Sequence, residues 1–144
     1  MPAFRAGKPS WVLGQSAGQS IGAGAAADLV WDVVDWQDPV IFDGTSTVTV
    51  DRPGLYLIGA HVTRVAGGTA GVPVVRLRLN GVTWVLNNGL NTAAAVSLPV
   101  TAMKKLEAGD QVLVNVSFSL VSAVATSAPS TEFWGSRIGP ERWT

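Results

Sequence analysis

Short segments in which apolar and polar residues alternate at every second position recur along this chain. This alternation is typical of β-strands, whose successive side chains point to opposite faces. Dipeptides that favour turns separate the segments. They are Asp43-Gly44, Pro53-Gly54, Gly67-Gly68, Asn80-Gly81, Asn88-Gly89 and Gly109-Asp110. About eight to ten short strands spaced in this way predict an all-β sandwich or barrel.

Three of the segments, 45–50, 74–80 and 111–120, carry valine, leucine or phenylalanine on one face. Their other faces carry mostly threonine, arginine, asparagine or serine, so each strand is expected to turn one face to the core. Asn80-Gly81 lies between two alternating segments and predicts a tight hairpin turn. The Gly-, Ala- and Ser-rich stretch 14–27 is expected to be irregular, with Ile21 as an anchoring contact.

The segment that follows Pro53-Gly54 is apolar on both faces. One face carries Tyr56, Ile58, Ala60 and Val62, and the other carries Leu55, Leu57, Gly59 and His61. A strand at the surface of a single small domain should keep one polar face. Only 14% of the residues are charged while 47% are hydrophobic, which is little charge for a domain that covers its own surface. We therefore expect other protein to cover part of this surface.

Composition also limits the class of protein. A length of 144 residues suggests one domain with a real core. The net charge of zero argues against nucleic acid as a partner, and the absence of a long apolar run argues against a membrane partner. The chain lacks cysteine, which excludes disulfides and thiolate metal sites. The N-terminus lacks a secretory signal, so synthesis in a cytoplasm is expected.

The sequence offers no catalytic constellation. His61 is the only histidine and lies mid-strand among apolar residues, where a packed or interfacial role is expected. Five aspartates cluster between residues 28 and 43 and suggest either a calcium site or solvated loop carboxylates. Their spacing matches no EF-hand loop, which favours the solvated reading. We therefore expect no catalytic residue, no metal ligand and no cofactor.

Four motifs follow one another in a fixed order. They are Gly54-x-Tyr56, Asn80-Gly81, Leu106 with Gly109-Asp110-x-Val112, and Phe133-x-Gly135. This order resembles the jelly roll of the complement 1q globular head and the tumour necrosis factor superfamily, over roughly residues 20 to 139. The resemblance implies an all-β, jelly-roll β-sandwich.

A closer likeness is to bacteriophage versions of this module. It is carried by Gln19-Ser20-Ile21 and by the stretch from Trp31-Asp32 to Phe42-Asp43. Domains that this chain resembles associate as compact trimers around a threefold axis, which implies a homotrimer. The strand after Pro53-Gly54 would then meet the neighbouring subunits. The implied interface residues are Leu55, Leu57, His61 and Phe133. The alternative, a loop of the same chain over this face, stays open.

Three parts are expected along the chain: an N-terminal arm at 1–18, a jelly-roll domain at 19–139 and a C-terminal tail at 140–144. Large aromatic side chains near the two ends suggest docking on another protein, such as a major capsid protein or another virion protein. These side chains are Phe4, Trp11 and Trp143. Folding back onto their own subunit is the alternative.

The favoured hypothesis is a bacteriophage virion protein, a trimeric capsid decoration or minor capsid protein assembled in the host cytoplasm. Because the sequence begins at Met1 and contains no shaft, decoration is preferred over a fibre. The second hypothesis is a tail-tip or fibre protein that binds a host surface glycan or protein through the loops at 66–72 and 87–93. An enzyme is the third hypothesis, and the missing catalytic constellation argues against it.

Overall fold

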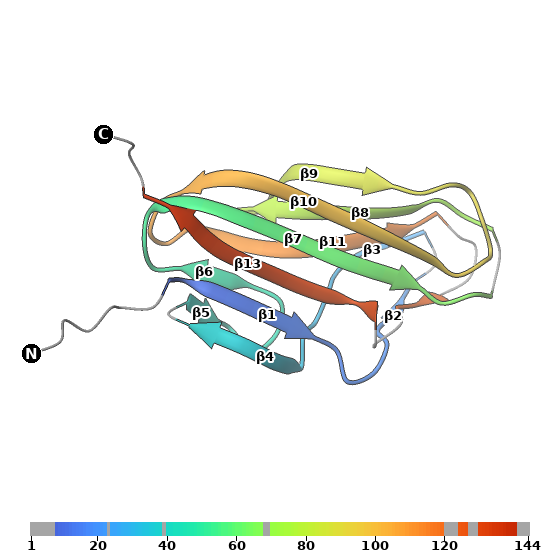
Figure 1. The fold of residues 1–144 in the computed structure, drawn as a ribbon. Coiled ribbons are helices and arrows are strands. Elements are labelled where there is room, and N and C mark those ends of the chain that lie inside the picture. The colour runs from blue at the N-terminus through green and yellow to red at the C-terminus, as the bar shows by residue number, and fades with distance from the viewer. Residues whose placement is uncertain are drawn as a thin grey trace, which may run out of the picture.

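The computed structural model describes residues 8–22, 24–38, 40–67, 70–119, 124–126 and 130–140. Within them, two antiparallel sheets pack face to face as a β-sandwich (Figure 1). The strands of one sheet follow the order β10-β7-β13-β1-β4 and those of the other follow β5-β6-β11-β8-β9, with β3 also paired to β11. A two-stranded ribbon joins β12 to β2. No helix in this described part of the chain has the length and apolar character needed to cross a membrane.

The strand bounds are as follows. The first seven are β1 (Ser10–Gly14), β2 (Ser20–Ile21), β3 (Ala26–Asp28), β4 (Val33–Asp38), β5 (Val40–Phe42), β6 (Val48–Val50) and β7 (Gly54–Arg64). The others are β8 (Pro73–Leu79), β9 (Val82–Asn88), β10 (Val96–Leu106), β11 (Gln111–Phe118), β12 (Val124–Ala125) and β13 (Glu132–Gly139). The short strand β2 and the first two residues of β3 lie in the stretch 14–27, which was expected to be irregular.

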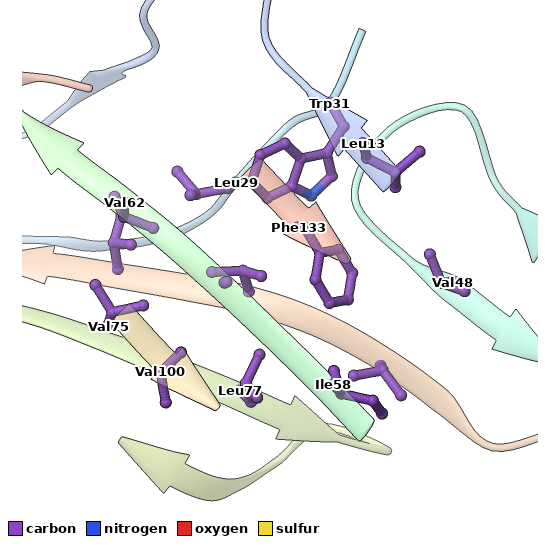
Figure 2. Packing of buried hydrophobic residues seen from close by; sticks show 14 of the residues in the cluster. Leu13, Leu29, Trp31, Val48, Ile58, Val62, Val75, Leu77, Val100 and Phe133 are labelled. Carbon is purple, nitrogen blue, oxygen red and sulfur yellow. The ribbon is translucent and has the colours of Figure 1, made fainter. Parts of the chain in front are cut away.

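The alternating segments place their apolar faces in the core between the sheets, as predicted. The buried residues that they contribute are Val48, Val50, Val75, Leu77, Val112, Val114, Val116 and Phe118. Figure 2 shows Val48, Val75 and Leu77 among the packed side chains. The hairpin at Asn80-Gly81 is also confirmed, because Leu79 pairs directly with Val82 and both turn residues have positive φ angles, 50° and 81°.

Strand β7 turns Tyr56, Ile58, Ala60 and Val62 inward, and each is at most 2% exposed. The Tyr56 hydroxyl donates a hydrogen bond to the Arg52 carbonyl oxygen at 2.7 Å, so the polar end of this buried ring has a partner. Burial raises the pKa of Tyr56 to about 12. The predicted core face of this strand is therefore confirmed.

Aromatic packing in the core corrects two predictions. Trp11 and Phe133 are fully buried, with ring centroids 5.6 Å apart in an edge-to-face arrangement. The ring centroids of Trp31 and Phe133 are 5.8 Å apart, and Figure 2 shows these two side chains next to each other. The docking role predicted for Trp11 and the interface role predicted for Phe133 are therefore wrong, because both side chains occupy inward positions of their strands.

The N-terminal boundary is corrected for the same reason. Strand β1 lies between β13 and β4, inside the five-stranded sheet, and its Trp11 and Leu13 are fully buried. The domain therefore begins before residue 19, and the arm predicted at 1–18 is wrong for its second half. Phe4 and Trp143 lie outside the described residues.

The position of Trp11 depends on a glycine. Gly135 is its direct cross-strand partner, and a Cβ added there would lie 2.3 Å from the indole ring. We expect Gly135→Ala to destabilise the fold by about 1–3 kcal/mol through overpacking. Denaturant unfolding measures this change. Gly22→Ala is the matched control, because its Cβ would meet only an ordinary contact at 3.6 Å.

The raised pKa of Tyr56 predicts sensitivity to alkali. A free tyrosine ionises near pH 10, so the stability linked to the neutral hydroxyl is lost as the pH rises from about 10 through about 12. Tyr56 is the only tyrosine, so ultraviolet absorbance of tyrosinate follows this group directly. Tyr56→Phe should lose about 1 kcal/mol at neutral pH and lack this alkaline component. Ionisation near pH 10 in the folded chain would contradict the prediction.

Candidate interaction surface

The outward-pointing residues of the five-stranded sheet form what we call the outer face. Cross-strand pairing arranges them in rows that run from β10 to β4. The central row is Thr101, Gly59, Trp134, Val12 and Trp36. On one side of it lie Met103, Leu57, Ser136, Ser10 and Asp38, and on the other lie Pro99, His61, Glu132, Gly14 and Val33. Leu55 and Lys105 lie beyond Leu57 and Met103.

Apolar side chains from several strands gather on this face, and its own chain leaves them partly exposed. Leu55, Leu57 and His61 are half-buried, on the face where the sequence placed them. Trp36 and Met103 are 55% and 61% exposed. Among the described residues, no loop buries these side chains. Large exposed apolar patches mark interaction sites on soluble proteins.

Two tryptophans shape the outer face. The Trp134 ring lies over Gly59, where an added Cβ would come within 2.2 Å of the ring. Trp36 donates a hydrogen bond from its Nε1 to the Ser10 Oγ at 2.8 Å. Glycine beneath one ring and a hydrogen bond beside the other hold both indoles against the sheet. The outer face therefore presents two indole rings.

The outer face of the six-stranded sheet has a different chemistry. Arg76 donates from Nη1 to Ser117 Oγ at 3.0 Å and to Asn115 Oδ1 at 3.3 Å. Asn115 in turn donates from Nδ2 to Asp28 Oδ1 at 2.8 Å. These polar groups satisfy one another on the strand surface. The centre of this face is therefore polar, in contrast to the tryptophans and leucines of the five-stranded sheet.

Two of the aspartates between residues 28 and 43, Asp32 and Asp43, accept hydrogen bonds from nearby residues. Asp32 accepts hydrogen bonds from the Ser16 hydroxyl and backbone N–H, which lower its pKa. Burial raises the pKa of Asp43, but hydrogen bonds from Thr45, Ser46 and Thr47 at the turn outweigh it and lower the pKa overall. Among the described residues, no three acidic or histidine side chains come together as metal ligands.

A buried arginine holds two loops at the end of the sandwich opposite Pro53-Gly54. Arg64 is 1% exposed, and Nη1 donates to the carbonyl oxygens of Thr92 and Ala94 at 2.8 Å. Its Nη2 donates to the Gly67 carbonyl oxygen at 2.8 Å. Gly71 and Thr92 also exchange two backbone hydrogen bonds at 3.1 Å. The loops proposed for recognition from the sequence are therefore tied together.

Sequence reasoning missed this arginine, although a signal was present. Arg64 continues the inward series of β7, which begins at Tyr56, so its position in the alternation is a core position. A charged residue there requires several hydrogen-bond partners inside the protein. Loop carbonyl oxygens supply these partners, and no sequence pattern identifies such acceptors in advance.

We expect Arg64→Met to loosen both loops and to cost at least about 2 kcal/mol, because three carbonyl oxygens lose a charged donor. Hydrogen exchange should accelerate in residues 65–72 and 89–95. Arg76→Met, which alters a half-buried arginine on the sheet surface, is the control and should leave exchange in these loops unchanged. Equal protection of the loops in both variants would contradict the anchoring role.

Comparisons with known proteins agree on the fold. Murine APRIL, in a crystal structure at pH 5.0, superposes with a TM-score of 0.69 at 16% identity, covering 92% of this chain and all of that one. The Eiger TNF of S. frugiperda gives a TM-score of 0.65 at 13% identity, covering 94% and 96%. No family model matches the sequence, and no curated protein matches it. The fold is a tumour necrosis factor-like jelly roll, which confirms the resemblance at the level of the fold.

Proposed function

We propose that this jelly roll is a non-enzymatic structural protein that associates as a homotrimer through its outer face and decorates a bacteriophage capsid. The apolar outer face is the observation that carries the proposal. Leu57, Trp134 and Met103 lie together there, and burying each such side chain contributes roughly 1.5–3 kcal/mol. Three copies of the contact per trimer offset the entropy cost of association.

A threefold assembly joins two different patches, because only a twofold axis brings a patch against itself. The second patch we assign is the β9–β10 edge of the sandwich (Figure 1). Val82 and Leu86 are 69% and 52% exposed along it. The edge of one protomer would thus cover the outer face of the next.

The composition of the four edge strands supports this choice. Natural edge strands are short or contain charged residues or proline, which prevents unwanted pairing with another chain. Strand β10 has Pro99 and two lysines, β4 has two aspartates, and β5 spans three residues. Strand β9 has neither charge nor proline. An edge without such protection is expected where another subunit covers it.

The virion assignment draws on the bacteriophage-like motifs. Gln19 accepts a hydrogen bond from the Val30 N–H at 2.8 Å and donates one to the Asp28 carbonyl oxygen at 3.1 Å. These bonds join the Gln19-Ser20-Ile21 motif to the residues just before Trp31-Asp32. The two ends of the described chain also meet, since the Arg137 N–H donates to the Pro9 carbonyl oxygen at 2.8 Å. The two ends of the described chain therefore lie at the same end of the sandwich. The segments beyond them would bind the capsid surface, and the three copies in a trimer would strengthen this binding through multivalency.

We expect Leu57→Glu to convert the trimer to monomers, because a buried, unpaired carboxylate would face the neighbouring subunit. The matched control is Leu113→Glu, on the outer face of the six-stranded sheet, which should stay trimeric. Multi-angle light scattering at micromolar concentration measures both masses. A stable wild-type monomer at that concentration would contradict the proposed assembly.

A second candidate is a tail-tip protein that binds a host surface glycan or protein. The loops held by Arg64 favour it, because a fixed loop pair is pre-organised for recognition. Binding of the isolated trimer to empty capsids, without adsorption to host cells, supports decoration. Adsorption to cells or to a glycan array, without capsid binding, supports the tail tip. Immunogold electron microscopy of the particles then locates the protein directly.

A further inference from the structure

The two edge strands of the five-stranded sheet carry charges of opposite sign. Strand β10, at one edge, contains Lys104 and Lys105 and no acidic residue. Strand β4, at the other edge, contains Asp35 and Asp38 and no basic residue. The sheet is therefore basic along one edge and acidic along the other, although the net charge of the whole chain is zero.

The two lysines lie on opposite sides of β10. Lys105 is exposed on the outer face, beyond Met103. Lys104 points to the other side of the strand, where its Nζ lies 5.9 Å from the centre of the Trp84 ring on β9. This contact between β10 and β9 places the ammonium group of Lys104 at the β9–β10 edge, which is the patch that we assign to the covering subunit.

Asp38 lies at the same level of the sheet as the lysines. It is the cross-strand partner of Ser10 and belongs to the row of the outer face that begins with Met103, next to Lys104 along β10. Figure 1 shows that β4 and β10 both end towards the end of the sandwich where the two termini lie. A rotation about an axis along the strands keeps each residue at its level. Such a rotation therefore brings the lysines of one subunit to the level of Asp38 in the next.

The charges of β4 and β10 are not paired within their own subunit. Among the described residues, no hydrogen bond or ion pair joins any of these four side chains to a group of opposite charge. Arg137, on β13 at the same end, donates from Nε to the Pro53 carbonyl oxygen at 2.9 Å. Lys8 precedes β1 and Glu107 follows β10, and both are exposed. The lysines and aspartates of the two edges are therefore available to a neighbouring subunit.

We propose that these charges set the order of the subunits, with Lys104 and Lys105 of one subunit facing Asp38 of the next. The proposal rests on the proposed function, because it needs the β9–β10 edge of one subunit to lie on the outer face of the next. In this head-to-tail order each contact joins opposite charges. A twofold dimer through like edges places lysine against lysine at β10, or aspartate against aspartate at β4, and like charges repel. The charges therefore favour a closed ring over a dimer.

Charge reversal on each side tests the pairing, with the trimer association constant measured by sedimentation equilibrium. Lys105→Glu and Asp38→Lys each place like charges together. A loss of about fivefold at each contact lowers the constant on the order of a hundredfold for the trimer. The double variant joins opposite charges again and should regain at least about tenfold. Asp28→Lys makes the same charge change on the six-stranded sheet, and this matched control should leave the constant unchanged.

A salt series on the wild type keeps the test independent of how well the variants fold. Association should weaken as sodium chloride rises from about 0.05 M to about 0.5 M, because salt screens exposed charges. A wild-type trimer that salt does not weaken, or a double variant no tighter than the weaker single variant, overturns the charge pairing and leaves the trimer standing. A wild-type monomer or dimer at every salt concentration overturns the assembly itself.

Discussion

Strand β7 has to satisfy apolar contacts on both faces, and the rest of the structure is arranged around that requirement. Its inward face packs Tyr56 and Ile58 into the core, while its outward face carries Leu55 and Leu57. The strand lies between β10 and β13, so its backbone hydrogen bonds are made on both sides within the sheet. The backbone hydrogen bonds and the inward face of β7 are therefore satisfied within the domain, while its outward apolar side chains stay partly exposed.

Two glycine–tryptophan pairs lie on opposite faces of the five-stranded sheet. Trp11 lies over Gly135 on the core side, and Trp134 lies over Gly59 on the outer side. In each pair the glycine is the direct cross-strand partner of the tryptophan, so the ring occupies the space of the missing side chain. One arrangement completes the core, and the other adds an indole ring to the outer face.

The alternation of residues was enough to predict the sandwich, the inward face of β7 and the hairpin at Asn80-Gly81. It failed at β1, where proximity to the terminus suggested an arm. Trp11 belongs to the core because Gly135, far away in sequence, makes room for it. Phe133 was misplaced because the motif that contains it identifies a strand but not which face of that strand points inward.

The anchor formed by Arg64 has a consequence for how this protein can vary. The guanidinium binds backbone carbonyl oxygens of Gly67, Thr92 and Ala94, and every amino acid supplies such an oxygen. Side chains in the two loops can therefore be exchanged without removing the acceptors that hold the loops in place. New surface chemistry can evolve at this tip while the scaffold beneath it stays the same.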